Sequence, residues 1–586
     1  MGQGAAVSRM SRRAWLRQGG ACLAAAASGS TLLTACDRSS APVWLTPEGG
    51  GWVGAQGARG HRLRDGTFAQ LSADALTRRV HTVIVGGGVA GLSAARVLRQ
   101  AGLDDFVLLE LEDQIGGNAR GHQMGGLPCP LGAHYLPVPG ANAHAVAQWL
   151  QELGVIHHRH GRWVGDERYL CHSPQERLFV PDRTVASSAA PAGVWPGQWH
   201  EGLMSAELLS REDRRQFEVF HRRVRQTAQA CAFAMPTGQA PWHAGHQALD
   251  AITFEHWLDQ AGLRSRPLRW YLDYACRDDY GAGLSRVSAW AGLQYFASRH
   301  DVTQDDWQDD ASPVLTWPEG NAWLTRQLAQ GLGERVQAGH VTVQVTASRH
   351  GVQVWSWSEH AQRHICWEVQ QVILAVPLFV AQRLLGGAVE ALTEHATRQR
   401  HAPWLVSNLL LREPLLDRTG APMAWDNVVF TSQSLSDVGI PALGYVQARH
   451  QSLAMPVGPH VLTHYWALGG ESEQQGRHWR QALMRDPWPT WAARVVADLS
   501  PVHPDLRDRV ARIDLMRYGH AMAIPEPGVR SAAALVALQR PQGAQGRIHF
   551  AHADLSAYSV FEEAFSHGVR AAHQVLSGAG ISRRII

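Results

Sequence analysis

Residues 80–117 read VHTVIVGGGVAGLSAARVLRQAGLDDFVLLELEDQIGG, and this stretch decides the fold. The β-branched run at its start predicts a strand, and the small-residue amphipathic run over residues 89–100 predicts a helix. A second apolar run, residues 106–109, predicts another strand that ends in Glu110. Because the first turn reads G-x-G-x-x-G, the stretch predicts a dinucleotide-binding unit; the alternative is a structural glycine turn.

The glycines of this turn have separate roles in such a unit. Gly86 makes the tight turn, Gly88 lets the backbone approach a pyrophosphate, and Gly91 lets the helix pack on the strand. The helix N-terminus presents free N–H groups to the phosphates. Glu110 lies 19 positions after Gly91, where a carboxylate binds the adenosine ribose. The residues predicted to bind the cofactor here are Gly86, Gly88, Val89, Ala90, Gly91 and Glu110.

The composition limits the chemistry and the partners. The chain has 586 residues, of which 45% are hydrophobic, enough for a large core and more than one domain. It contains no lysine, which excludes Schiff-base chemistry and a P-loop lysine. The formal charge is +3, and no basic patch indicates a nucleic-acid partner.

The N-terminus has the features of an export signal. Residues 11–17, SRRAWLR, resemble a twin-arginine motif, and an Ala/Gly-rich apolar stretch follows over residues 19–33. Residues 33–36, LTAC, resemble a bacterial lipobox, so we expect Cys36 to become a lipidated N-terminus; the alternative is an ordinary cleaved signal. These features predict export by the twin-arginine machinery to the bacterial periplasm and a lipid anchor in the inner membrane.

The remaining cysteines and the histidine cluster predict neither a disulfide framework nor a metal site. The cysteines show no C-x-x-C spacing and are odd in number, so we expect buried thiols. Residues 157–160, HHRH, have poor spacing for metal ligands and no nearby acid, so we expect a solvated loop and no metal.

Two later segments show a resemblance to a known family. Residues 114–120 read QIGGNAR and residues 131–135 read LGAHY. With the dinucleotide unit, they make the chain resemble the flavin amine oxidase superfamily, which includes amine oxidases, protoporphyrinogen oxidases and carotenoid desaturases. The resemblance implies that the unit binds FAD. It also implies that one segment touches the pyrophosphate and the other runs past the flavin ring, through Gly116, Gly117, Asn118, Arg120, Gly132, Ala133 and His134. Asn118 stands where the family has an arginine, and Arg120 is the candidate to replace its charge.

The resemblance extends to the end of the chain. Residues 316–321, TWPEGN, resemble the turn that leads back into the FAD domain, and Val341 would contact the adenine. Ala375 would lie in a strand over the cofactor. Asp554 ends another strand and would bind the ribityl or pyrophosphate region. The helix after it would point its N-terminus at the flavin, which would stabilise reduced flavin, through Phe561, Glu562 and Ala564.

The expected fold class is α/β: a Rossmann-like FAD-binding domain built from discontinuous segments, plus an α+β substrate domain with a helical part and a mixed sheet. Strands are expected over residues 405–411, 427–431, 443–448 and 461–467. The predicted boundaries are 1–36 for the signal, 37–78 for a tether and loop-rich lead-in, 79–140, 313–400 and 511–586 for the FAD domain, 141–312 for the helical part and 401–510 for the substrate sheet.

The chemistry follows from the cofactor. No second G-x-G-x-x-G unit indicates an NAD(P)H domain, so electrons should come from a small organic substrate by hydride transfer to flavin N5. The acceptor would be dioxygen or a membrane quinone or cytochrome. No cysteine lies near the last motif, so FAD should be non-covalent. The catalytic candidates are His520, Tyr135 and Tyr558.

Three hypotheses remain open on the sequence. The first is an amine oxidase or dehydrogenase, which a carboxylate beside the flavin would favour. The second is a desaturase or isomerase of an apolar polyene or porphyrin-like molecule, which a wide apolar channel would favour. The third is a non-catalytic periplasmic flavoprotein.

Overall fold

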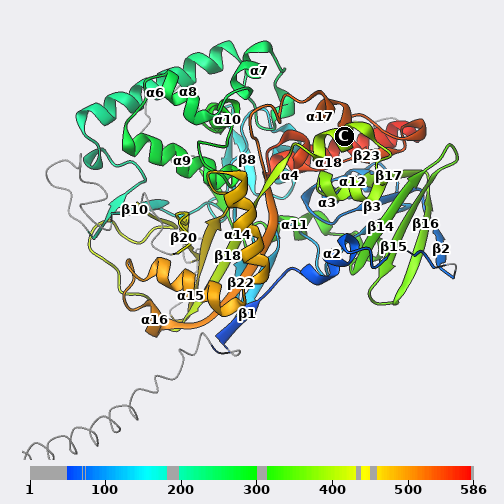
Figure 1. Cartoon of the computed structure of the whole chain (residues 1–586), viewed down its shortest axis with the longest axis horizontal. Helices are drawn as coiled ribbons and strands as arrows, with labels where there is room; N and C mark the ends of the chain where they lie inside the picture. Colours follow the sequence, from blue (N-terminus) through cyan, green and yellow to red (C-terminus); the bar gives the residue numbers. More distant parts are fainter. Residues whose placement is uncertain are drawn as a thin grey trace, which may run out of the picture.

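The structure is a computed structural model that describes residues 46, 49–68, 70–72, 74–180, 197–299, 313–430, 437–448 and 458–581. The predicted signal, residues 1–36 with Cys36, lies outside the described residues. Two halves lie side by side in Figure 1, one built on a parallel sheet and the other on a larger mixed sheet. Within the described ranges, no helix combines the length and the apolar character needed to cross a membrane.

The first half is organised around a five-stranded sheet with the order β13-β4-β3-β17-β23. Every neighbouring pair in it is parallel, and all residues of β3, β4 and β17 are buried, as in parallel sheets covered on both faces. The strands come from distant parts of the chain: β3 (Thr82–Val85), β4 (Phe106–Leu109), β13 (Val336–Gln337), β17 (Gln371–Leu374) and β23 (Ile548–Phe550). The predicted discontinuous α/β fold is therefore confirmed.

Helices cover one face of this sheet and a second sheet covers the other. Helices α3 (Val89–Gln100) and α18 (Phe561–Gly578) pack together, and a Cβ at Gly568 would lie 2.1 Å from the Ala90 carbonyl oxygen, so only glycine permits this approach. The second sheet packs its apolar side chains against the parallel strands. Its strands are β14 (His340–Ala347), β15 (Val352–Ser358), β16 (Arg363–Val369) and β2 (Leu76–Arg79).

The second half contains an eight-stranded mixed sheet with the order β1-β22-β18-β21-β20-β19-β10-β11. Helices α6–α10 pack over one face and α14–α15 over the other (Figure 1). The four predicted strands correspond to β18–β21 and are confirmed. The strands are β1 (Gly50–Trp52), β10 (Glu176–Val180), β11 (Gln198–Glu201), β18 (Arg400–Leu411), β19 (Asp426–Val429), β20 (Gly444–Gln447), β21 (His460–Ala467) and β22 (Val510–Ile524). The helices are α6 (Arg211–Ala230), α7 (Ala244–Asp250), α8 (Phe254–Gln260), α9 (Arg266–Tyr280), α10 (Ala289–Arg299), α14 (Glu473–Arg485), α15 (Trp488–Leu499) and α16 (Leu506–Arg509).

Smaller elements connect the two halves. Strands β7 (Tyr135–Pro137) and β12 (Val314–Thr316) pair antiparallel and bring two crossings of the chain together. The remaining elements are β5 (Gly121–Met124), β6 (Leu127–Pro130), α4 (His144–Glu152), β8 (Ile156–Arg159), β9 (Arg162–Gly165), α11 (Ala322–Ala329), α12 (Leu378–Leu385), α13 (Glu390–Ala396) and α17 (Ala533–Leu538). The HHRH run forms the exposed end of the β8–β9 hairpin rather than an unstructured loop.

Two stretches differ from the expected secondary structure. The lead-in, predicted as tether and loop, contains β1, the helix α2 (Gly57–Arg64) and β2. Strand β1 exists because it pairs with residues 513–515 of β22, far away in the sequence, and α2 buries none of its residues completely. Neither element has a local pattern that would reveal it. In residues 141–312, predicted as mostly helical, β10 and β11 extend the substrate sheet.

Candidate active site

A long groove, with an empty volume of about 1400 Å³, runs from the glycine turn to the N-terminus of α18. We call it the cofactor groove. It is bordered by the ends of β3, β4 and β17, where α/β proteins bind nucleotides. Predicted cofactor residues that line it are Gly86, Gly88, Val89, Ala90, Glu110, Gly116, Gly117, Asn118, Ala133, Ala375, Phe561 and Ala564.

The glycine turn has the geometry that a phosphate-binding turn requires. Gly86 has φ +104°, and a Cβ there would lie 2.4 Å from the Ala375 carbonyl oxygen. A Cβ at Gly91 would lie 1.9 Å from the Gly86 carbonyl oxygen, so the first turn of α3 packs directly on the strand. Gly88 is the N-cap of α3. Because glycine has no side chain that could accept hydrogen bonds from the first N–H groups of the helix, these groups are left to bind an anion.

Glu110 is fixed at the end of β4. Its Oε2 accepts a hydrogen bond of 2.7 Å from the Gly87 N–H, and its Oε1 accepts one of 2.9 Å from the Glu112 N–H. Burial raises the pKa of the Glu110 carboxyl, against the effect of these two hydrogen bonds. The carboxyl is held where a ribose hydroxyl would reach it.

The residues of the groove fit FAD. Two buried oxygens that belong to lining residues, Asn321 Oδ1 and Thr342 Oγ1, have no hydrogen-bond partner in the described protein, which indicates a polar ligand. The described residues that line the groove include no arginine, so the helix N-terminus and backbone N–H groups would bind the pyrophosphate. They also include no cysteine, which fits a non-covalent cofactor.

Arg120 does not replace the missing arginine of the turn. Its Nε donates to the Gly117 carbonyl at 3.0 Å and its Nη1 to the Gly54 carbonyl at 3.1 Å, and it does not line the groove. The Glu112 carboxylate lies 3.8 Å from Nη1. Because the chain reverses at Gly116 and Gly117, which both have positive φ, the side chain of Arg120, three positions after Gly117, points toward the lead-in. Arg120 therefore stabilises the turn from the side that faces away from the groove, by joining it to the lead-in.

Asp554 also turns away from the groove. It is fully buried, and its Oδ2 accepts a hydrogen bond of 2.9 Å from the Leu378 N–H at the start of α12. Burial disfavours its charge, but His552 and His401 beside it hold the pKa of Asp554 well below its usual value. Its neighbours His552 and Ala553 line the groove instead. Asp554 itself does not line the groove, because its buried side chain contacts the start of α12 and two histidines.

Val341 lies inside β14 and does not line the groove. Its neighbours His340 and Thr342 do, because successive side chains of a strand point to opposite faces. The side chains of β14 that face the groove are therefore those on either side of Val341, the residue that the resemblance indicated.

Two further spaces continue from the cofactor groove. An inner cavity of about 820 Å³ shares Asn118, Ala133, Asn321, Ala521 and Phe561 with the groove. An outer cavity of about 960 Å³ shares His134, Tyr135, Asp278 and Tyr465 with the inner one. The predicted cofactor residues Gly132, His134 and Glu562 line the inner cavity, not the groove.

Of the three catalytic candidates, only Tyr135 lines the two cavities. Tyr558 is completely buried and does not line either cavity, and its hydroxyl donates to the carboxylate of Asp279, which lines the inner cavity. His520 lines the cofactor groove, where its ring packs 4.7 Å from that of Phe379. Burial, with a contribution from a nearby arginine, lowers the pKa of His520 to about 3, so it is neutral at physiological pH.

Acidic side chains dominate the polar part of both cavities. Asp278, Asp279 and Glu562 line the inner cavity, and Glu176, Asp278 and Asp426 line the outer one. No arginine is found among the described residues that line either cavity. Since the chain contains no lysine, histidine is the only other basic type, and burial lowers the pKa of His134 to about 3. The two cavities therefore favour cations.

Two carboxylates of the outer cavity, Asp278 and Asp426, interact through their charges. The hydroxyl of Tyr274 donates to Asp426 Oδ2 at 3.3 Å, and that of Tyr135 donates to Asp278 Oδ2 at 3.3 Å. Burial, and then the charge of Asp278, raise the pKa of Asp426 to about 7. Sequence reasoning missed Asp426 and Glu176, because nothing local indicates that the starts of β19 and β10 meet α9.

Aromatic rings complete the cavity walls. The ring of His134 stacks on that of Tyr465 with centroids 4.4 Å apart and lies 5.3 Å from that of Trp425. The Tyr465 hydroxyl donates to the Gly132 carbonyl at 3.1 Å, which fixes the ring against the flavin-side turn. The faces of these rings add a second, weaker attraction for a cation.

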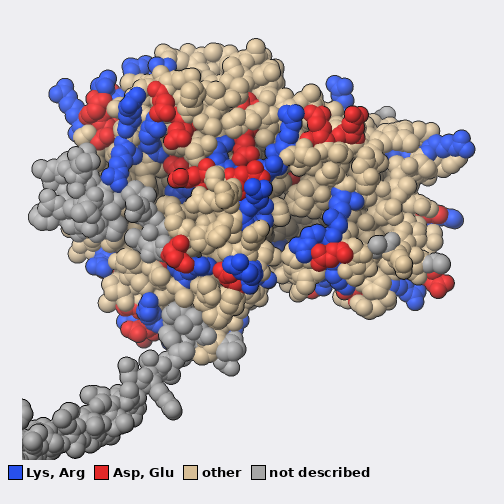
Figure 2. Space-filling model, in the orientation of Figure 1, with Lys and Arg blue, Asp and Glu red and all other residues tan. Residues whose placement is uncertain are grey.

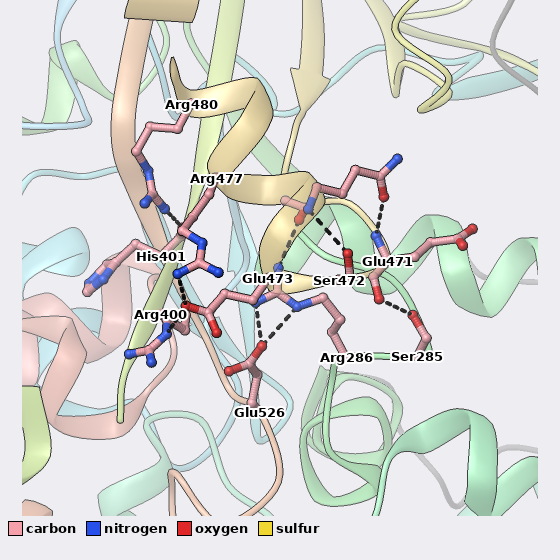
Figure 3. A network of polar contacts seen from close by, with 12 residues as sticks. Ser285, Arg286, Arg400, His401, Glu471, Ser472, Glu473, Arg477, Arg480 and Glu526 are labelled. Atoms are coloured by element: carbon pink, nitrogen blue, oxygen red, sulfur yellow. Dashed lines mark hydrogen bonds and ion pairs between the residues drawn. The ribbon is translucent and has the colours of Figure 1, made fainter. Parts of the chain in front are cut away.

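A polar network joins α14 to β18 (Figure 3). Arg480 of α14 donates to the His401 carbonyl at 2.5 Å and to the Gly519 carbonyl at 2.7 Å. It thereby ties β18 to β22 where both strands border the groove. Nearby, Arg400 pairs with Glu473 at 2.8 Å. The backbone that carries His520 and Ala521 is held in place by these contacts.

A doubly covered parallel sheet with this glycine turn, groove and adjoining cavity defines an FAD-dependent oxidoreductase. The comparison with known families gives the particular class. The chain belongs to the family described as "Flavin containing amine oxidoreductase", whose model matches residues 89–576.

Individual relatives differ in their substrates. A coproporphyrinogen III oxidase of Mycobacterium bovis is 36% identical over 327 residues, 54% of this chain and 63% of the relative. A putative flavin-containing monoamine oxidase of Mycobacterium tuberculosis is 28% identical over 310 residues, 51% of this chain and 57% of the relative. The chain thus matches less than two thirds of the length of each.

The fold is also found in solved structures. A putrescine oxidase bound to putrescine superposes with a TM-score of 0.60 and 17% identity, over 86% of this chain and 100% of that chain. A cyclohexylamine oxidase from Brevibacterium oxydans superposes equally well, with a TM-score of 0.60 and 16% identity over 86% of this chain and 99% of that one.

Proposed function

We propose that the protein oxidises a cationic amine, by hydride transfer from the carbon next to nitrogen to the N5 atom of FAD. One observation carries this proposal: five carboxyl side chains line the two cavities, and the described lining includes no arginine. A partly desolvated ammonium group needs such partners, since burying an unpaired charge is costly. The names of the amine-oxidising relatives support the same class of substrate.

The shape of the site gives each residue a role. FAD held in the cofactor groove would supply the hydride acceptor. Asp278 and Asp279 hold the ammonium group in the inner cavity, which adjoins the groove at Asn118 and Phe561. The aromatic walls exclude water and orient the carbon to be oxidised.

A proton must leave the ammonium group before hydride transfer, because the nitrogen lone pair drives loss of the hydride. Asp426 Oδ2, with a pKa of about 7 for its carboxyl, is a base of suitable strength, and it is coupled to Asp278 in the cavity that adjoins the reacting one. The hydroxyl of Tyr274 steadies the proton-accepting carboxylate.

The coproporphyrinogen oxidase relative suggests the second candidate, a porphyrin-like substrate. Coproporphyrinogen carries carboxylate side chains, which five acidic wall residues would repel. The charge of the cavities therefore favours an amine over this substrate.

We also propose that the protein is exported by the twin-arginine machinery and anchored in the inner membrane through Cys36. The motif SRRAWLR and the LTAC run support this proposal, as does the need to load FAD into a folded protein before export. The electron acceptor would then be dioxygen or a membrane quinone or cytochrome.

Anaerobic bleaching of the bound flavin tests the function. The purified holoenzyme is mixed with monoamines, diamines, a neutral polyene and coproporphyrinogen, and its flavin absorbance is followed. We expect amines to bleach the flavin and Asp278→Asn to weaken their effect. Bleaching by coproporphyrinogen or the polyene and not by amines would support the second candidate. A yellow protein that no compound bleaches would indicate a non-catalytic flavoprotein.

A further inference from the structure

We propose that residues 50–65, which precede the glycine turn, form a strap that retains FAD by closing the adenosine end of the cofactor groove. The strap comprises β1, the connecting residues 53–56 and α2, ending at Asp65. It starts on the substrate half and ends on the FAD half, beside the groove (Figure 1). The inference concerns only FAD and does not depend on the proposed substrate.

The first end of the strap is fixed to the large sheet. Strand β1 pairs in parallel with β22, with Gly50 opposite Ile513 and Trp52 opposite Leu515. The guanidinium of Arg517 lies 4.5 Å from the centroid of the Trp52 ring. This end is therefore a permanent part of the substrate half.

The middle of the strap is tied to the loop that follows Glu110. The N–H of Gln56 donates to both oxygens of the Glu112 carboxylate, at 3.1 and 3.0 Å. The carbonyl of Gly54 accepts the hydrogen bond from Arg120. The strap thus contacts the loop whose first residue is the expected ribose ligand.

Helix α2 closes the groove at the second end. The Nη1 of Arg59 donates to the Leu111 carbonyl at 2.7 Å and pairs with the Asp113 carboxylate at 2.9 Å. On the other side of the groove, Arg383 of α12 donates to the Leu63 carbonyl at 3.0 Å. The helix is therefore attached to both edges of the groove, and Figure 2 shows the recess between the two halves that it borders.

Leu63 itself lines the cofactor groove, in company with Glu110, His340 and Thr342. These neighbours define the adenosine end. The described lining of the groove lacks arginine and the chain lacks lysine, which leaves histidine as the one basic side-chain type there. Physical enclosure by the strap would add to the retention of FAD that the helix N-terminus and the backbone N–H groups provide.

The strap is weak on its own, which makes it able to open. Helix α2 has eight residues, none of them completely buried, and it has no side-chain cap at its N-terminus. So short a helix is unstable in isolation, and contacts with other segments stabilise it, among them those of Arg59, Arg62 and Leu63. Release of FAD then requires these contacts to break.

The experiment compares FAD release from three variants of the holoenzyme. Arg59→Ala removes the attachment of α2 to the Leu111–Asp113 loop. Arg64→Ala is the matched control on the same helix, because the Arg64 side chain is 61% exposed and pairs only with its neighbour Asp65. Asp113→Asn breaks the Arg59 pair from the opposite partner, at a side chain that is 54% exposed and can change without disturbing the core.

The release is followed as the rise of free flavin fluorescence after dilution, and amide hydrogen exchange of residues 57–64 is measured with and without FAD. We expect Arg59→Ala to release FAD about ten-fold faster, Asp113→Asn about three-fold faster and Arg64→Ala at the wild-type rate. We also expect FAD to slow exchange in α2. Equal rates of FAD release from the wild type and all three variants would overturn the proposal. Amide hydrogen exchange in α2 at the same rate with and without FAD would also overturn it. If Arg59→Ala does not fold, Asp113→Asn and the exchange data decide it.

Discussion

Replacing Asp426 with asparagine should make the protein more stable at alkaline pH and a poorer binder of amines. The side chain is partly buried at the start of β19, where its Oδ2 accepts a hydrogen bond from the Tyr274 hydroxyl and its charge repels that of Asp278. An asparagine keeps the hydrogen bond and the volume, and it removes the charge. Stability should rise while amine binding weakens, and a general loss of structure cannot produce both changes.

The stability change follows from the pKa, which the fold raises from 3.8 to about 7. The folded state prefers the protonated acid, so stability is full below pH 3.8, falls as the pH rises toward 7 and stays low above it. A difference of about three pKa units corresponds to at most about 4 kcal/mol. Asp426→Asn should therefore raise the free energy of unfolding by part of this amount above pH 7 and leave it unchanged below pH 4.

The binding change follows from Coulomb's law. A cation about 6 Å from the carboxylate gains roughly 3 kcal/mol at an effective dielectric constant of about 20. Desolvation of the amine offsets part of this gain, and a loss of about 1.4 kcal/mol corresponds to ~10-fold in KM. In the wild type, KM should fall as the pH rises through about 7, because the carboxyl then ionises. In Asp426→Asn this step should disappear.

The assay combines denaturant unfolding at pH 5 and pH 8 with anaerobic flavin reduction over a range of amine concentrations. Glu394→Gln is the control with the same change in charge, because Glu394 is 54% exposed and far less able to affect either quantity. An Asp426→Asn protein with wild-type stability at pH 8 and an unchanged KM profile would refute the reasoning about this cavity.

Three further changes test other parts of the site. Gly91→Ala should abolish FAD binding, because its Cβ would lie 1.9 Å from the Gly86 carbonyl oxygen; the flavin-to-protein absorbance ratio measures this. Tyr558→Phe should lower the free energy of unfolding by about 1–2 kcal/mol, through loss of the hydrogen bond to Asp279, and leave the flavin content unchanged in the same absorbance measurement. Arg480→Met should lower the melting temperature and weaken FAD binding together, since it frees two carbonyls at the groove wall, and a titration of apoprotein with FAD detects it.

The parts of the site that contiguous residues define could be predicted from the sequence. The glycine turn, Glu110 and the start of the last helix depend on short patterns, and they line the groove or its continuation. Four strands of the substrate sheet, β18–β21, could also be predicted, because their apolar runs are clearly bounded. A local pattern therefore suffices where the backbone itself makes the contact.

Side-chain direction could not be predicted. Arg120 points to the lead-in and Tyr558 to Asp279, although both lie within the expected motifs. The meeting of Asp426 with Asp278 depends on how a strand and a helix pack, 148 positions apart in the chain. The lead-in shows the same limit, because β1 forms through pairing with residues of β22. Such features are determined by tertiary packing, which no short segment encodes.

The order of strands in the parallel sheet has a consequence for biosynthesis. Strand β23, residues 548–550, completes the edge beside β17, so this edge remains open until almost the whole chain has been made. An open edge of buried, apolar strands invites pairing with other chains. Sheets closed by distant segments also fold slowly. A chain truncated between residues 374 and 548 keeps β17 and lacks β23, so we expect it to yield aggregates rather than a smaller flavoprotein.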